Sequence, residues 1–230
     1  MTPEELASRH PQLFHQMPVG RWESVVEHGL LPPRLLLERA GMDAQTVDAL
    51  TLKPRRTAAV FEDTPMGRVV ISDNIPLSET ALRRCLDDGL SPQDWCGMLA
   101  ERVFFWANER NLDGLLRARS IRDVARDVLV IDTLGFVTAH FDRVELSPIN
   151  SGSTIRKAAR RGFSTYAPLS GVESYREWSE RRTDAGVKRS RDVVREVTVR
   201  GVADVAPYVV ERRHYAGGCY TVLERRASRG

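Results

Sequence analysis

The sequence predicts an α+β protein with helices concentrated in the N-terminal half and strands in the C-terminal half. Several early segments carry apolar residues at helical spacing and are separated by Gly and Pro breakers. Valine-rich runs typical of strands gather after residue 100. Because helices and strands are segregated rather than regularly alternating, we expect one α+β domain over residues 1–230.

Composition indicates an ordinary globular protein, with 42% hydrophobic and 28% charged residues. A net charge of +3 is too small to establish a nucleic-acid partner by itself. Cys85, Cys96 and Cys219 show no Cys-x-x-Cys spacing, which favours a reduced, cytoplasmic protein. No segment approaches the ~20 apolar residues of a membrane span, so no membrane partner is expected.

In the first half, caps and apolar spacing define the expected helices. Trp22, Val25 and Val26 share one face, with Gly29 in the position of a C-terminal cap. Ser91 is a typical N-cap and Pro92 a typical first helical residue. Residues 57–75 are ambiguous and favour two strands with Pro65 and Gly67 at the turn. The expected helices cover 18–28, a short segment ended by Gly41, 43–52, 78–86 and a segment from 91 onward.

In the second half, short apolar runs predict strands at 103–106, 127–132, 136–141, 143–146 and 217–223. Residues 107–111 are expected as a loop, with helices at 112–119 and near 204–210. The segment 175–191 is basic and expected to be poor in regular structure. It precedes a valine-rich strand within residues 191–201.

Glu196 lies in the middle of this last strand. Alternation places it on one face with Val194 and Thr198, while Val197 and Val199 take the other face. A carboxylate at such a position is costly to bury unless it has a partner or a use. The functional interpretation is a carboxylate that stabilises a developing positive charge; the alternative is a strand-edge glutamate that faces water.

Several common signatures are absent from the sequence. It contains no Gly-x-Gly-x-x-Gly, no Walker-type phosphate loop, no His-Glu-x-x-His and no Gly-x-Ser-x-Gly. The five histidines do not share ligand spacing with the cysteines. We therefore expect no metal site and neither a Rossmann oxidoreductase nor a common hydrolase.

Three motifs occur in an informative order. His15 precedes a helix that closes on His28-Gly29, the segment 103–110 runs from a valine through aromatic residues to Arg110, and 196–199 reads Glu-Val-Thr-Val. In this order they resemble NAD-dependent ADP-ribosyltransferases, most closely the DarT-type enzymes that modify DNA. The chain departs from that pattern at residues 21–22, 111–113 and in the long segment 34–101.

The resemblance implies a split β-sandwich of the ADP-ribosyltransferase type and NAD as co-substrate without a metal. Glu196 would stabilise the ribosyl cation that forms when nicotinamide leaves, as carboxylates do in glycoside hydrolysis. Arg110 would hold the pyrophosphate or handle the nucleophile. His15, Gly29, Phe105 and Trp106 would contact the cofactor. Taken singly, His15 is better explained as a core histidine and Arg110 as a solvated side chain.

The basic segment before Glu196 lies where a macromolecular acceptor would approach. Its cations would neutralise phosphates and its aromatic residues would stack on bases. Single-stranded DNA is the favoured partner, RNA is the next, and a protein acceptor remains open. The family resemblance implies a toxin or phage-defence role, with an antitoxin such as an ADP-ribosyl hydrolase. The nucleic-acid-binding candidates are Arg181, Arg182, Lys188, Arg189, Arg191, Tyr175 and Trp178.

Two alternatives stay open. One keeps NAD and changes the reaction to RNA 2'-phosphotransfer, which requires additional arginines around the acceptor phosphate. The other is a non-catalytic module that uses the basic segment to dock nucleic acid or a protein partner.

Overall fold

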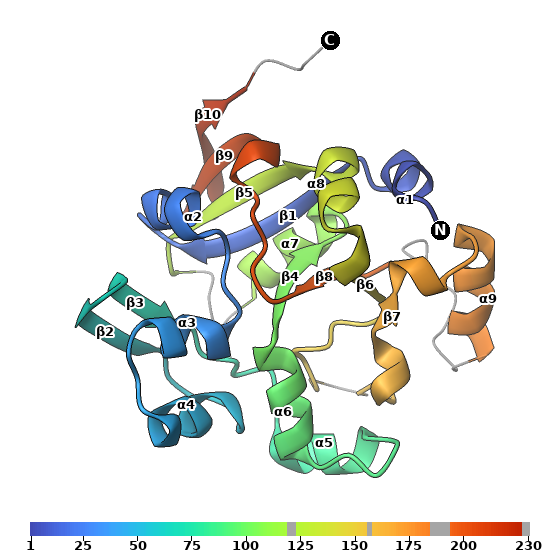
Figure 1. The fold of residues 1–230 in the computed structure, drawn as a ribbon, viewed down its shortest axis with the longest axis horizontal. Coiled ribbons are helices and arrows are strands. Elements are labelled where there is room, and N and C mark those ends of the chain that lie inside the picture. Colours follow the sequence, from blue (N-terminus) through green and yellow to red (C-terminus); the bar gives the residue numbers. More distant parts are fainter. Residues whose placement is uncertain (119–122, 156–157, 185–193, 227–230) are drawn as a thin grey trace.

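A computed structural model describes residues 1–118, 123–155, 158–184 and 194–226 of the chain, with 181–184 described by their backbone. Its centre is an antiparallel eight-stranded sheet in the order β10-β9-β5-β1-β4-β8-β6-β7 (Figure 1). The mixed α+β class is confirmed. The strands are β1 (Gln12–Pro18), β4 (Arg102–Trp106), β5 (Arg126–Asp132), β6 (Val144–Ser147), β7 (Ala167–Pro168), β8 (Glu196–Arg200), β9 (Val209–Ala216) and β10 (Cys219–Arg225).

Most α-helices of the described residues precede β5, as the sequence predicts. Ser91 caps α6 through a reciprocal capping box with Asp94, and Gly29 ends α2 at a φ of 72°. The helices are α1 (Pro3–Arg9), α2 (Trp22–His28), α3 (Pro33–Arg39), α4 (Ala44–Thr51), α5 (Glu79–Cys85), α6 (Pro92–Ala100), α7 (Glu109–Leu116), α8 (Thr133–Ala139) and α9 (Tyr175–Asp184).

The sheet is split between β1 and β4. β1 pairs with β5 along its whole length, and β4 pairs likewise with β8. Between β1 and β4, in contrast, the registered partners in the described chain are Phe14 and Trp106 alone. Two four-stranded half-sheets, β10-β9-β5-β1 and β4-β8-β6-β7, therefore meet at this pair and diverge beyond it.

Alternation along the strands separates a main core from a polar face. Val103, Phe105, Val197 and Val199 lie in the main core, together with α8 and the inward residues of β1 and β5. The opposite face of β1 and β5 packs against Leu112 and Leu116 of α7. On the β4-β8-β6 half-sheet, the face opposite the core is polar instead. It carries Arg102, Glu145, Glu196 and Thr198, all buried.

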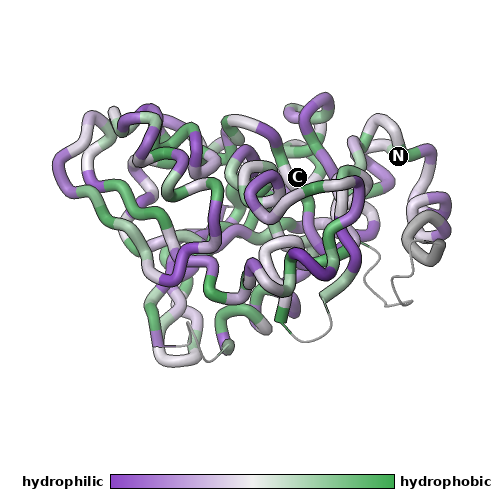
Figure 2. The backbone as a smooth tube through the Cα atoms, turned by 90° about the horizontal axis from the view of Figure 1, so that it is seen from below, coloured by the Kyte–Doolittle hydropathy of each residue, from purple (hydrophilic) through white to green (hydrophobic). Residues whose placement is uncertain are grey.

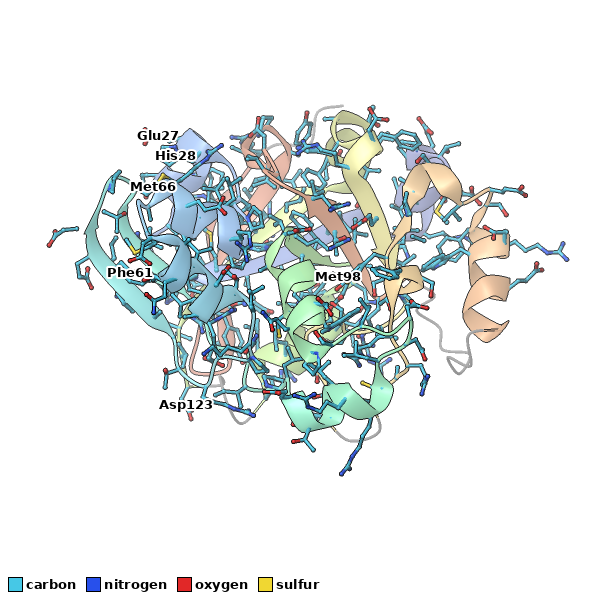
Figure 3. All side chains as sticks on the ribbon, turned by 60° about the horizontal axis from the view of Figure 1, so that its bottom comes forward. Glu27, His28, Phe61, Met66, Met98 and Asp123 are labelled. Atoms are coloured by element: carbon cyan, nitrogen blue, oxygen red, sulfur yellow. The ribbon has the colours of Figure 1, made fainter. Side chains whose placement is uncertain are left out.

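Residues 30–77 form a compact lobe beside the sheet. The lobe contains α3, α4 and the hairpin of β2 (Ala59–Thr64) and β3 (Gly67–Ile71), which confirms the two strands predicted around Pro65 and Gly67. It occupies the left of Figure 1, and hydrophobic stretches alternate with hydrophilic ones in the same region of Figure 2. Phe61 and Met66, labelled in Figure 3, pack against its small core. That core consists of Leu37, Ala40, Val47, Val69 and Ile71.

Four local predictions are wrong. Residues 133–139 are a helix, α8, because the Asp132 side chain caps it by accepting from the Gly135 N–H. Likewise Asn108 caps α7, so Arg110 lies in the first helical turn rather than in a loop. The basic segment begins as a helix, α9, instead of lacking structure. Near residue 207 only a short 3₁₀ helix forms, and β9 starts at Val209.

Among the described helices, none combines the length and the apolar character that crossing a bilayer demands.

Candidate functional site

A cavity of about 680 Å³ occupies the split between the half-sheets. Gln16 and Met17 of β1 line it from one side, and Val103 and Phe104 of β4 line it from the other. The 30–77 lobe supplies a further wall. The volume of the cavity lies within the range of small-molecule and cofactor sites.

Every residue predicted for catalysis or cofactor binding lines this one cavity. They come from five places in the chain: β1, the residue after α2, β4, α7 and β8. Phe105 contributes little surface, because it is 1% exposed and packs against Phe136 in the main core. Trp106, on the opposite face of β4, is half-buried. The set is His15, Gly29, Phe105, Trp106, Arg110 and Glu196.

Gly29 has a structural explanation of its own. A Cβ at this position would lie 2.9 Å from Val202 Cγ1 and 3.0 Å from the Ala203 carbonyl oxygen. The neighbouring Leu30 exchanges two backbone hydrogen bonds with Ala203. Glycine is therefore required where α2 meets the chain after β8, whatever the cavity binds.

Glu196 opens β8 and is 4% exposed, so the water-facing alternative is wrong. Its carboxylate accepts from Ser151, whose hydroxyl lies 2.7 Å from Oε2. The Ser151 backbone N–H also donates, at 3.3 Å to Oε1 and 3.2 Å to Oε2. A buried carboxyl with these partners at a cavity wall is held in one orientation.

Burial raises the pKa of Glu196 to about 7. The hydrogen bonds from Ser151 and the nearby Arg195 and Arg161 oppose this rise and lower the pKa, but burial has the larger effect. A carboxyl that titrates near neutrality exchanges a proton readily at ordinary pH, which is the property of a general acid or base.

Ser151 is itself fixed by a second layer of side chains. The Arg161 guanidinium donates to the Ser151 carbonyl at 3.0 Å and to the Ser153 carbonyl at 3.1 Å. The Trp95 indole N–H also donates to the Ser151 carbonyl, at 3.3 Å, and Arg161 lies 5.7 Å from the Trp95 ring. The loop that holds Glu196 is thus anchored to the body of the protein.

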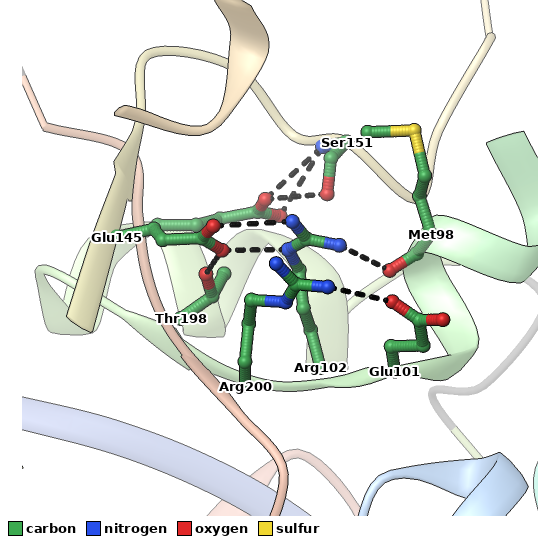
Figure 4. A network of polar contacts seen from close by, with 8 residues as sticks. Met98, Glu101, Arg102, Glu145, Ser151, Thr198 and Arg200 are labelled. Atoms are coloured by element: carbon green, nitrogen blue, oxygen red, sulfur yellow. Dashed lines mark hydrogen bonds and ion pairs between the residues drawn. The ribbon is translucent and has the colours of Figure 1, made fainter. Parts of the chain in front are cut away.

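A buried ion pair lies beside Glu196 on the same sheet face. Arg102 donates to Glu145 through two nitrogens, at 2.7 and 3.1 Å, and to the Met98 carbonyl at 2.7 Å (Figure 4). Thr198 adds a hydroxyl 3.3 Å from the same Glu145 carboxylate. Because the Glu145 carboxylate is bonded to Arg102 and Thr198, we assign Glu145 a structural role. Glu196 is then the carboxyl that is available at the cavity wall.

His15 is held with one nitrogen on the backbone of β4. Its Nδ1 lies 2.8 Å from the Phe104 carbonyl oxygen, and its ring centroid lies 5.6 Å from that of Phe105. A carbonyl only accepts, so Nδ1 carries the proton. Burial lowers the pKa of His15, which favours the neutral ring with Nε2 as a hydrogen-bond acceptor.

Arginines gather around the cavity. Arg110 is exposed in the first turn of α7, and the Arg195 guanidinium lies 5.9 Å from the Trp106 ring centroid. On the lobe side, Arg55 donates to the Ser72 carbonyl at 2.9 Å, and burial lowers its pKa. The arginines that line the cavity are Arg21, Arg55, Arg68, Arg102, Arg110 and Arg195.

The predicted base-stacking residues are not available in this structure. Trp178 is 3% exposed in the main core, and Tyr175 hydrogen-bonds His10 at 3.0 Å. Both anchor α9, because a helix that starts beside α1 buries its apolar residues there. Of the predicted cations, Lys188, Arg189 and Arg191 fall outside the described residues. Arg181 and Arg182 lie in α9, and only their backbone is described.

The sequence offers little signal for the supporting residues. Ser151 stands in a turn-rich segment and Arg161 in a basic stretch that reads as a solvated surface. Only Glu145 has a recognisable signal, as a charge between the apolar Val144 and Leu146 of a short strand. In the part of the chain that the structure describes, no three His, Cys, Asp or Glu side chains cluster as metal ligands.

The chain belongs to a protein family described as "Family of unknown function (DUF7002)", whose model matches residues 11–209. This range includes His15, Arg110, Ser151 and Glu196. No curated protein matches the chain.

Proposed function

We propose that this member of the DUF7002 family is an NAD-dependent ADP-ribosyltransferase. The observation that carries the proposal is the Glu196 carboxyl, which is buried at the wall of a cavity between two half-sheets. The cavity has the volume of a cofactor site. It is lined by all the residues that the resemblance to DarT-type enzymes assigns to catalysis and cofactor binding. A split sheet with a cavity in the split also supports a fold of the ADP-ribosyltransferase type.

The reaction breaks the bond between the nicotinamide nitrogen and ribose C1', and both electrons leave with nicotinamide. Positive charge develops on the ribosyl group, and the ionised Glu196 stabilises it. A nitrogen of the acceptor then forms the new bond to C1' and releases its proton. Glu196, with a pKa of about 7, is suited to accept that proton and pass it to solvent.

Neighbouring residues would bind and orient the two substrates. His15 is neutral and offers Nε2 as an acceptor for a ribose hydroxyl. Arg110 carries a guanidinium suited to phosphate oxygens. Trp106 offers a half-buried ring at the point where the half-sheets meet.

A nucleobase in single-stranded DNA is the acceptor we propose, with RNA as the second choice. The exposed Arg110 and the half-buried Arg195 give the cavity cationic neighbours on the α7 side. A base must leave its stack before its ring nitrogen reaches C1', which favours single strands. The resemblance to DarT-type enzymes suggests a cytoplasmic toxin or phage-defence role that an ADP-ribosyl hydrolase counters.

A second candidate, NAD-dependent RNA 2'-phosphotransfer, gains support from the arginines around the cavity. Six line it, which is more than the sequence alone indicates. Four of them are engaged, however: Arg102 with Glu145, Arg55 with backbone carbonyls, Arg21 with the Arg68 carbonyl, and Arg68 with Glu62. ADP-ribosyl transfer to a base therefore remains the first proposal.

The test is incubation of the protein with labelled NAD and single-stranded oligonucleotides, followed by mass spectrometry. We expect nicotinamide release and an ADP-ribose adduct on one type of base. ADP-ribose 1'',2''-cyclic phosphate from a 2'-phosphorylated RNA would establish the second candidate instead. Salt-sensitive oligonucleotide binding without nicotinamide release would refute both and leave a binding module.

A further inference from the structure

The cavity has two chemically different sides. His15 and Gln16 are consecutive residues of β1 and point to opposite faces of the strand, yet both line the cavity. On the His15 side the lining is mainly apolar, with Met17, Val25 and Leu30. On the Gln16 side it is polar and includes Trp106, Arg110 and Asn111 of β4 and α7.

On the second side, one polar atom of each of two side-chain amides has no hydrogen-bond partner among the described residues. Asn111 is 8% exposed, and its Nδ2 is buried without a hydrogen bond to any described residue. Gln16 likewise has a buried Oε1 with no partner in the described chain. A buried polar atom without a partner is destabilising, so a ligand that satisfies both atoms gains binding energy here.

The ligand that fits such a pair is planar and carries a donor and an acceptor. Exchanging the nitrogen and oxygen of a side-chain amide leaves its outline unchanged, so the pair can present its two roles in either order. The Watson–Crick edge of a nucleobase offers a donor next to an acceptor. Asn and Gln commonly bind donor–acceptor pairs on base edges, as they do with adenine in the major groove of DNA.

We propose that Gln16 and Asn111 recognise the edge of the acceptor nucleobase while Trp106 supports its ring. This assignment rests on the proposed function, because it concerns the second substrate of the same site. The nucleophile must attack C1' from the side opposite the leaving nicotinamide. With the donor on the His15 side, the Gln16 side is the approach left to the base.

Geometry also places this side next to Glu196. Trp106 and Glu196 are direct cross-strand partners, so they share one sheet face. Asn111 follows Trp106 after the turn that starts α7. A base stacked near Trp106 therefore lies close to the carboxyl that would receive its proton.

The test compares Gln16→Met and Asn111→Leu with Gln45→Met, an exposed amide on α4 that serves as the matched control. We measure ADP-ribosyl transfer to a single-stranded oligonucleotide and NAD hydrolysis without one. Each site variant is expected to lower kcat/KM for the oligonucleotide about 10- to 100-fold, with the KM for NAD in hydrolysis unchanged. An equal loss in both reactions assigns the amides to the donor and overturns the proposal, as does an unchanged kcat/KM.

A binding measurement separates this inference from the proposed function. Ligand-detected NMR with free nucleosides reports base binding whether or not NAD is consumed. One outcome is that the wild type binds a nucleoside, that Asn111→Leu abolishes the binding signal, and that no NAD is turned over. In that case the base subsite is supported and the transferase proposal fails. If NAD is turned over but no nucleoside binding depends on either amide, the subsite is wrong. Thermal unfolding checks that each variant folds.

Discussion

Trp106 on β4 and Glu196 on β8 are direct partners in the antiparallel ladder. Phe14 of β1 pairs with the same Trp106, and Ser147 of β6 pairs with Glu196. One row of partners thus crosses four strands at the place where the two half-sheets still touch. The buried carboxyl is positioned by this row, directly beside the opening of the split.

Replacement of Glu196 tests its catalytic role. Glu196→Gln keeps the shape of the side chain and removes the charge that would stabilise the ribosyl cation. We expect ADP-ribosyl transfer to fall by about 10²- to 10³-fold, the typical loss when one electrostatic stabiliser is removed. Transfer is measured as labelled product per unit time at saturating NAD.

The matched control is Glu23→Gln, an exposed glutamate in the first turn of α2. Its transfer rate should equal that of the wild type. Full activity in Glu196→Gln would show that this carboxyl is not catalytic.

Ser151 lowers the pH at which Glu196 ionises. Its hydroxyl, 2.7 Å from the carboxylate, stabilises the charged form and lowers the pKa. Ser151→Ala removes this bond and should raise the pKa by about one unit, which corresponds to a charge-assisted hydrogen bond of about 1.5 kcal/mol. The acid limb of the pH profile of kcat/KM, expected near pH 7 in the wild type, should move to higher pH.

Ser153→Ala is the control for this shift, because Ser153 lies in the same loop and meets Arg161 through its backbone carbonyl. Its profile should superimpose on that of the wild type. An acid limb that Ser151→Ala leaves in place would mean that another group controls the rate.

Glu196 should also make stability depend on pH. Folding raises its pKa from 4.5 to about 7, so its protonated form is the one favoured in the folded state. The stability contributed by this group is therefore fully present below pH 4.5 and is lost as the pH rises through about 7, by up to about 3 kcal/mol. Glu196→Gln does not ionise, so it should be more stable than the wild type at pH 8, with the difference disappearing toward pH 4.

Urea unfolding at several pH values measures this difference. The mutant is expected to have the higher midpoint at pH 8 with an unchanged m-value. A midpoint difference that does not vary with pH would contradict the raised pKa.

The sequence predicts the local parts of this site better than their assembly. The strand around Glu196, the glycine after α2 and the cap at Ser91 follow from short-range rules of alternation and capping. The bond between Ser151 and Glu196 joins residues 45 positions apart, and no local pattern encodes it. Tertiary packing also decides that Glu196 is buried.

The aromatic residues of α9 also show that the sequence alone does not predict which side chains are buried. In the sequence, Tyr175 and Trp178 stand among basic residues and resemble a base-stacking surface. In the structure α9 turns them toward α1 and the main core, since a helix buries whichever face is apolar. The binding surface predicted from composition is wrong at these two residues, because the segment forms a helix and buries its apolar face.

Trp178 therefore supports a prediction about stability. Trp178→Ala should lower the free energy of unfolding by about 3–5 kcal/mol, as expected when a large side chain in a core is truncated. Arg176→Ala, on the exposed face of α9, should change it by less than about 0.5 kcal/mol, because its pairing with Glu180 is a surface interaction. Denaturant unfolding measures both, and oligonucleotide affinity is measured at a temperature where both variants stay folded. If Trp178→Ala weakened oligonucleotide binding strongly at unchanged stability, Trp178 would contact nucleic acid and its burial in the core would be wrong.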